Sequence, residues 1–180
     1  MFSKIALAVL ATSLLTSASF ARELNFKEGV IGAQTEILGD SNIAPKCSHI
    51  TAKLNMDDAA LESLKGEISM DLINLKSENE KRDEHMYEAL HVKEHPSTMF
   101  KLKEVKKEAD GYHLLGTLTL NKQIKEINTK ADITDQSDLL KLKGGFSIKM
   151  SEFGIEPPTL LFLSVRDEVV ISYDLTLAKN

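Results

Sequence analysis

Apolar and polar residues alternate along most of this chain, and this alternation limits the fold more than any other feature. Between Leu64 and Leu72 every second residue is apolar or glycine, and the residues between them are polar. A period of two residues is typical of a β-strand with one buried face. We predict about eight strands, from alternating segments and short apolar runs at 29–38, 50–56, 64–72, 98–102, 112–120, 123–133, 140–150, 159–165 and 169–177.

Short turns connect these strands, and Asp110-Gly111 is a turn pair that hairpins favour. Strands do not alternate with long helices, so an antiparallel sheet is expected rather than a parallel one. Closing the sheet on itself removes its exposed edges. The predicted fold class is all-β, an antiparallel barrel of about eight strands. Such an interior is either filled by side chains or open to one small ligand.

One short helix is predicted from about Lys81 to Leu90. Met86, Leu90 and either Ala89 or Tyr87 lie three to four residues apart, so one side of the helix is apolar and the other is charged. Pro96 has no N–H to donate and ends the helical region. We expect this helix to cap the mouth of the barrel.

The first residues indicate export. Lys4 precedes an apolar run from Ile5 to Leu15, and Ser19-Phe20-Ala21 offers small residues at a cleavage site. Residues 1–21 are therefore predicted to be a secretory signal peptide, and 22–180 a single domain. The apolar run is shorter than the roughly 20 residues that span a bilayer. We expect a periplasmic or secreted protein that is not anchored to a membrane.

Charge and cysteine content exclude further classes. The formal net charge is −5, and no basic cluster follows the pattern of a nucleic-acid site, so nucleic acid is not an expected partner. Cys47 is the only cysteine and cannot form an internal disulfide. A small buried hydrophobe is a better interpretation of Cys47 than a reactive thiol, although its role stays open.

Several short motifs resemble a known family. They are Arg82-Asp83-Glu84-His85, then Leu90, Val92, Pro96 and Phe100, followed by Leu118-Thr119-Leu120, Phe153-Gly154-Ile155 and Asp167-Glu168-Val169. Their order and spacing resemble the YceI-like proteins, which are exported, have a lipocalin-like barrel and hold a polyisoprenoid or another lipid. The resemblance implies a lipocalin-like barrel with a lipid in its interior.

The predicted strands would direct a set of apolar side chains inward, as small-molecule sites require. The expected lining is Met70, Leu72, Phe100, Leu102, Leu114, Leu118, Leu142, Phe146, Ile148, Phe153, Ile171 and Tyr173. Gly66, Gly116 and Gly144 fall on the same faces, where missing side chains would leave room for a chain-like ligand. Taken alone, the pattern favours a packed core, and the resemblance reverses that order in favour of a ligand.

The mouth residues allow two interpretations. Arg82 and Asp83 could anchor the helix through hydrogen bonds and an ion pair, or Arg82 could meet a pyrophosphate or carboxylate headgroup, and we favour the anchor. Met86 and Leu90 complete the helix side that we expect at the mouth.

The charged helix also contains histidines, and nearby residues could in principle bind a metal. His85, His91 and His95 lie close in sequence, but Pro96 disrupts their helical spacing and no cysteine is nearby, so no metal site is expected. We found no nucleophile with a base, no metalloprotease motif and no phosphate-binding glycine loop. An enzyme is therefore not predicted.

Two departures from the family pattern limit what can be said of a ligand. Met150 stands where the family often has arginine, and Asn121 where it has histidine. An isoprenoid, a quinone-like molecule or a fatty-acyl lipid all remain open, as do its donor, its acceptor and a homodimer. The leading hypothesis is an exported carrier of a long-chain lipid. The alternative is a stress-related structural or interaction protein with a filled barrel.

Overall fold

The computed structural model describes residues 21–37, 41–57, 60–160 and 163–180, and the predicted signal peptide lies almost wholly outside them. Eight long strands form an antiparallel barrel in the order β12-β9-β8-β7-β6-β5-β4-β1, and pairing of β12 with β1 closes it. The predicted fold is confirmed. These strands are β1 (Ala21–Ile37), β4 (Thr51–Asp57), β5 (Lys65–Asp71), β6 (Ser97–Glu108), β7 (Gly111–Leu120), β8 (Gln123–Asp135), β9 (Leu139–Lys149) and β12 (Glu168–Lys179).

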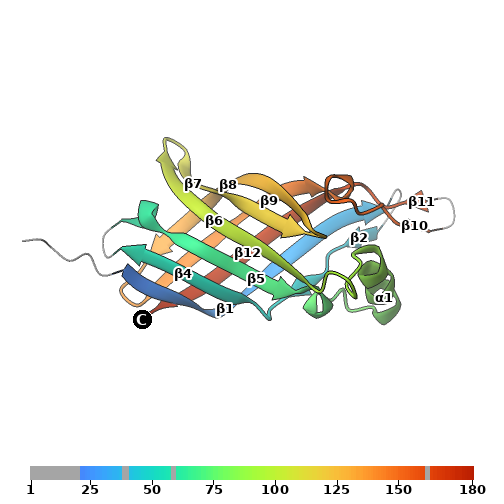
Figure 1. Cartoon of the computed structure of the whole chain (residues 1–180), viewed down its shortest axis with the longest axis horizontal. Coiled ribbons are helices and arrows are strands. Elements are labelled where there is room, and N and C mark those ends of the chain that lie inside the picture. The colour runs from blue at the N-terminus through green and yellow to red at the C-terminus, as the bar shows by residue number, and fades with distance from the viewer. Residues whose placement is uncertain (1–20, 38–40, 58–59, 161–162) are drawn as a thin grey trace, which may run out of the picture.

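The smaller elements gather mainly at one end of the barrel. Helix α1 and the β10–β11 hairpin lie at this end, and the C-terminus lies at the opposite end (Figure 1). Short strands β2 and β3 pair with β1. The bounds are β2 (Ser41–Ile43), β3 (Lys46–Cys47), η1 (Leu61–Ser63), η2 (Leu72–Asn74), α1 (Glu80–Ala89), η3 (Met150–Phe153), β10 (Thr159–Leu160) and β11 (Leu163–Ser164).

The prediction of a barrel strand over 159–165 is wrong. Its described residues form the small β10–β11 hairpin instead, and Val165 N donates to Pro158 O at 2.9 Å. Pro157 and Pro158 have no N–H to give to a ladder. The chain therefore leaves the barrel wall here and returns with β12.

Strand β1 begins eight residues before the predicted segment because a β-bulge hides its period. Pairing with β12 shifts register between Phe26 and Glu28, so the inward positions change from even to odd numbers. Gly29 follows at φ 144°, where an added Cβ would collide with the Asp174 carbonyl oxygen. A bulge of this kind bends a strand and changes the direction of its side chains.

Strands β8 and β9 separate toward the α1 end. Their pairing extends only from Ala131–Asp135 to Leu140–Gly144, and η3 packs beside the remainder. The Asn121 side chain, in the β7–β8 turn, donates through Nδ2 to Phe153 O at 2.9 Å. Ser151 N and Oγ donate to the Asp167 carboxylate at 2.8 and 2.6 Å. Hydrogen bonds on both sides thus hold η3 against the gap in the ladder.

The packed core fills the end away from α1. Leu24, Leu54, Leu64, Leu140 and Leu177 are fully buried there in one cluster. A second cluster lies toward the other end and contains Leu72, Val92, Leu118, Ile148 and Phe153. The barrel is therefore tightly packed at one end, and its remaining interior lies toward α1.

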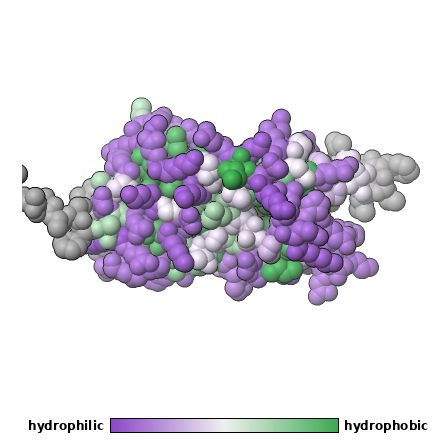
Figure 2. Space-filling model, viewed as in Figure 1, coloured by the Kyte–Doolittle hydropathy of each residue, from purple (hydrophilic) through white to green (hydrophobic). Residues whose placement is uncertain are grey.

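Polar residues cover most of the face seen in Figure 2. Among described residues, Ile73, Ile124 and Val170 are the large hydrophobic side chains left exposed. In the described part of the chain, no helix has both the length and the apolar character needed to cross a bilayer.

Candidate binding cavity

A cavity of about 940 Å³ occupies the α1 end of the barrel. This volume lies in the upper part of the roughly 300–1,000 Å³ range of small-molecule sites. Leu102, Leu114, Leu142 and Leu175 line it and also belong to the packed cluster, so they form its floor. The cavity therefore begins where the leucine core ends.

The predicted lining residues border this cavity with one exception. Those on its wall are Met70, Leu72, Phe100, Leu102, Leu114, Leu118, Leu142, Phe146, Ile148, Ile171 and Tyr173. Phe153 does not line it, because it lies in η3 just beyond the end of β9 and packs into the second cluster at 1% exposure. Whether the wall residues contact a lipid stays a prediction.

Sequence reasoning missed much of the remaining wall. Strand β1 contributes Ile31, Ala33, Thr35 and Ile37, all of which belonged to the predicted strand 29–38 but not to the expected lining. Ile43 at the end of β2 and loop residues including Pro45, Pro157 and Val165 also border the cavity. The alternation in 29–38 was a usable signal for β1, whereas loop residues have no periodicity to reveal their direction.

The three inward glycines do not leave room for a ligand, and that expectation is wrong. A Cβ on Gly116 would collide with the ring of Phe100, and one on Gly144 would collide with the ring of Tyr173. A Cβ on Gly66 would meet the backbone of Lys53 and Leu54. Neighbouring rings and main chain use the space beside these glycines, as aromatic side chains often do over strand glycines.

Polar side chains deep in the wall form hydrogen bonds with main-chain carbonyl groups. Thr98 Oγ1 donates to Thr119 O, and Thr129 Oγ1 donates to Gly145 O, both at 2.8 Å. Burial raises the pKa of Tyr173, so its hydroxyl stays neutral at physiological pH. Among the described lining residues, formal charges come only from α1 and Glu156. The inner cavity is thus uncharged and mostly apolar.

Helix α1 forms one side of the cavity opening, as predicted for a capping helix. The side chain of Asn79 caps its first turn by accepting from Arg82 N at 3.1 Å. Met86 and Leu90 line the cavity. The Tyr87 hydroxyl lies 2.8 Å from the Leu75 carbonyl oxygen and helps to attach the helix to the η2 segment.

Arg82 and Asp83 do not act as a pair. Asp83 is buried and its Oδ1 accepts from both Ser77 N at 2.8 Å and Ser77 Oγ at 2.6 Å. Arg82 instead lines the cavity half-buried, and no carboxylate of a described residue lies within ion-pair distance of it. The anchoring interpretation therefore fits Asp83, and the expected ion pair is not present.

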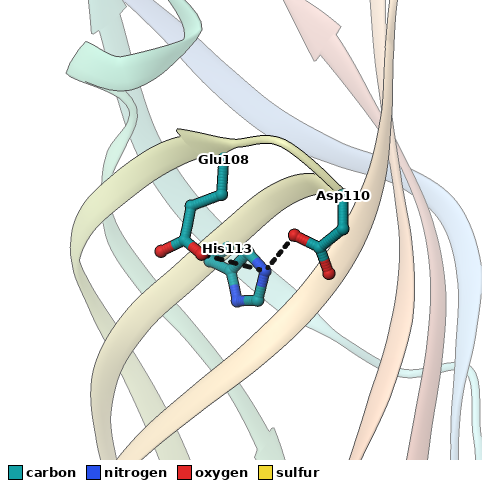
Figure 3. A group of neighbouring side chains, drawn as sticks. All are labelled: Glu108, Asp110 and His113. Atoms are coloured by element: carbon teal, nitrogen blue, oxygen red, sulfur yellow. Dashed lines mark hydrogen bonds and ion pairs between the residues drawn. The ribbon is translucent and has the colours of Figure 1, made fainter.

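The three histidines considered as possible metal ligands do not come together in the structure. His85 lines the cavity, and His91 has left-handed backbone at φ 51° with Nδ1 3.4 Å from Asn121 Oδ1. Among described residues, the group whose ligand atoms approach one another is Glu108, Asp110 and His113, within 4.8 Å. These side chains lie together at the β6–β7 hairpin, away from α1 (Figures 1 and 3).

The Glu108–Asp110–His113 group is a hydrogen-bonded charge network. His113 Nε2 lies 3.1 Å from Asp110 Oδ1, and Lys130 Nζ lies 3.2 Å from Asp110 Oδ2. The pKa of His113 is raised by its bond to Asp110, and the pKa of Asp110 is lowered by His113 and Lys130. His113 and Lys130 both approach the Asp110 carboxylate, so the geometry supports a clasp that holds the β6–β7 hairpin.

Known proteins share this barrel over nearly its whole length. The family model described as YceI-like domain matches residues 21–177. This chain belongs to the YceI-like family. A UPF0312 protein of Pectobacterium atrosepticum is 30% identical over 169 residues, which cover 86% of this chain and 88% of the relative.

Solved structures confirm the YceI-like fold. BcnA of Burkholderia cenocepacia matches with a TM-score of 0.72 at 16% identity, over 82% of this chain and 95% of that one. A polyisoprenoid binding domain from Saccharophagus degradans matches with a TM-score of 0.69 at 9% identity, over 88% and 98%. At these identities the likeness establishes the architecture and leaves the ligand of this chain undetermined.

The two departures from the family pattern occupy different environments in this YceI-like barrel. Met150 is buried and lines the cavity, where its thioether adds apolar surface. Asn121 does not line the cavity and instead holds η3 through the Phe153 and Gly154 carbonyls. Cys47 is buried, and burial raises the pKa of its thiol, so it remains protonated and unreactive at neutral pH.

Proposed function

We propose that this YceI-like protein binds one long-chain lipid, such as an isoprenoid, a quinone-like molecule or a fatty-acyl chain, in the barrel cavity. The observation that carries the proposal is the cavity of about 940 Å³ with a largely apolar wall and an uncharged interior. Removing apolar surface from water yields about 25 cal/mol per Å². A hydrocarbon chain gains this free energy along its length and needs no single polar contact.

The filled-barrel alternative is not favoured, because the side chains of this barrel leave the α1 end unfilled. The polyisoprenoid binding domain with the same fold adds support, since it shows that such a barrel is compatible with a lipid ligand. The predicted signal peptide supports a carrier that works in the periplasm or outside the cell. There it would sequester or transfer a lipid across an aqueous compartment, without catalysis.

The experiment is to purify the protein from cells and analyse an organic extract by mass spectrometry. We expect a stoichiometric long-chain lipid in the extract, and uptake of an added isoprenoid by delipidated protein. Ala33→Phe places a ring in the cavity and should lower the lipid load severalfold. Gln34→Phe adds the same ring on the exposed side of β1 and is the matched control.

Folding of both variants is checked by circular dichroism before lipid is measured. A wild-type protein that neither contains nor takes up lipid would contradict the proposal. An equal loss of lipid in Ala33→Phe and Gln34→Phe would contradict the assignment of the cavity as the site.

A further inference from the structure

The cavity side of α1 changes character along the helix. The residues that it contributes to the wall are Lys81, Arg82, His85, Met86, Glu88, Ala89 and Leu90. The first turn therefore presents basic groups, and the later turns present mainly apolar ones. A ligand that contacts this whole surface needs an acidic part beside the first turn and an apolar part beyond it.

The two cations of the first turn are available to such a ligand. Among the described residues, neither Lys81 nor Arg82 has a carboxylate within ion-pair distance, whereas Arg166 pairs with Glu36 at 3.1 Å elsewhere on the barrel. The adjacent Asp83 is occupied by its bonds to Ser77. Arg82 is half-buried, so it has lost part of its hydration without gaining an acidic partner from the described part of the chain.

Two acids also line the cavity, and their positions matter. Glu88 follows Lys81 by seven residues, which places it about 10 Å further along the helix axis at 1.5 Å per residue. Glu156 comes from the connection after η3 and makes no ion pair with Arg82 or Lys81. The basic groups thus remain concentrated at the start of α1, where the positive end of the helix dipole adds to them.

We propose that Lys81 and Arg82 bind the anionic headgroup, a phosphate, diphosphate or carboxylate, of the amphiphile whose chain occupies the cavity. This inference rests on the proposed lipid-binding function and narrows its ligand class. The guanidinium of Arg82 can donate two parallel hydrogen bonds to such a group, and Lys81 adds a second charge. Met86 and Leu90 then contact the first part of the chain, which runs toward the leucine floor.

The test compares amphiphiles that share a chain and differ in the headgroup. Delipidated full-length protein is titrated with hexadecyl phosphate, palmitate and hexadecanol, and with inorganic diphosphate alone. We expect the two anionic amphiphiles to bind about tenfold or more tighter than hexadecanol, because charge-assisted hydrogen bonds are roughly twice as strong as neutral ones. Inorganic diphosphate should bind far more weakly, since it lacks the chain.

Variants assign the preference to the two side chains. Lys81→Gln with Arg82→Gln should abolish the anionic preference, so that the three amphiphiles bind with similar affinity, and Arg82→Lys alone should keep part of the preference. Lys141→Gln removes an exposed cation of β9 that does not line the cavity, and it should behave as wild type.

Each contrary result has one meaning. Equal affinity for all three amphiphiles in the wild type, or a preference that survives Lys81→Gln with Arg82→Gln, overturns the headgroup inference and leaves lipid binding intact. Binding of inorganic diphosphate as tight as hexadecyl phosphate also overturns it, because the site would then recognise a free anion. Failure of every amphiphile to bind overturns the proposed function itself.

Discussion

The two ends of the barrel are built from the same alternating strands, but one end is packed and the other contains the cavity. At the end away from α1, Leu24, Leu54 and Leu140 are fully buried and fill the interior. At the α1 end, Phe146 and Ile171 are only half-buried and border the cavity. One end is a core in the ordinary sense, and the other is a wall around unoccupied volume.

This difference separates stability from binding. Close packing at the leucine end supplies contacts that an unfilled cavity forgoes, since a void leaves its lining atoms without partners on one side. A bound chain would restore those contacts at the α1 end. The barrel can therefore keep one end of its interior open, because packing at the other end holds the fold together.

The largest expected effects come from one substitution at each end of the barrel, measured as stability and as lipid load. Leu140→Ala removes a fully buried side chain that does not line the cavity, so it should lower the free energy of unfolding by about 2–5 kcal/mol. The lipid load per folded molecule should stay close to wild type. Phe146→Ala should lower the lipid load and cost less stability, because its ring is already half-exposed.

Chemical denaturation of delipidated protein and extraction of the purified protein measure the two quantities separately. Ser147→Ala, on the exposed face beside Phe146, serves as the control. The comparison fails if Leu140→Ala empties the folded protein of lipid while Phe146→Ala leaves the load unchanged.

The predictability of the two ends from sequence also differs. Strand alternation in β5 to β9 and in β12 identified most of the lining residues that were predicted correctly, because a period of two fixes the direction of each side chain. It did not reveal the part of β1 that precedes the bulge at Phe26/Glu28, and it misplaced Phe153, which lies outside any strand. The volume could not be predicted, because it depends on how the Phe100 and Tyr173 rings settle over glycines.

The mouth of the cavity could also be predicted only in part, and the reason is different. Helix α1 follows from its apolar spacing and from Pro96, and its observed bounds differ by one residue from the prediction. The sequence does not indicate that Asp83 is buried while Arg82 lines the cavity. This difference depends on Ser77, which a polar loop brings next to the helix. Adjacent residues on a helix face different directions, and tertiary contacts decide which one is buried.

An effect of intermediate size should separate the roles of Asp83 and Arg82 at the α1 end. Asp83→Ala leaves Ser77 N–H and Oγ without their acceptor and should cost about 1–3 kcal/mol in the free energy of unfolding. Arg82→Ala should leave the midpoint of thermal unfolding nearly unchanged, because Arg82 has no ion pair with a described residue to lose. Differential scanning calorimetry of the two delipidated variants measures both.

Ser77→Ala is the matched control for Asp83→Ala, because it removes the hydroxyl donor and keeps the backbone donor. It should therefore cost less than Asp83→Ala. A larger loss of stability from Arg82→Ala than from Asp83→Ala would reverse the roles assigned to these neighbours.

The smallest effect is a pH dependence confined to the packed end. The bond to Asp110 raises the folded-state pKa of His113 above its ordinary value of 6.5, so the stability that it adds is complete below that value and disappears as pH rises through the raised pKa. The pKa of Asp110 is lowered from 3.8, so its contribution is present above 3.8 and is lost as pH falls through the lowered value. Both contributions are present between about 3.8 and 6.5.

We therefore expect His113→Gln to destabilise the protein slightly at pH 5.5 and by less at pH 8.5, with a loss below that of Asp83→Ala because the clasp is open to solvent. Urea unfolding of wild type and variant at the two pH values measures the difference. His49→Gln, at an exposed histidine, is the control. Because the clasp lies at the end away from α1, His113→Gln should also carry the wild-type lipid load at each pH. A destabilisation that grows from pH 5.5 to pH 8.5 would show that the neutral imidazole, rather than its protonated form, holds this hairpin together.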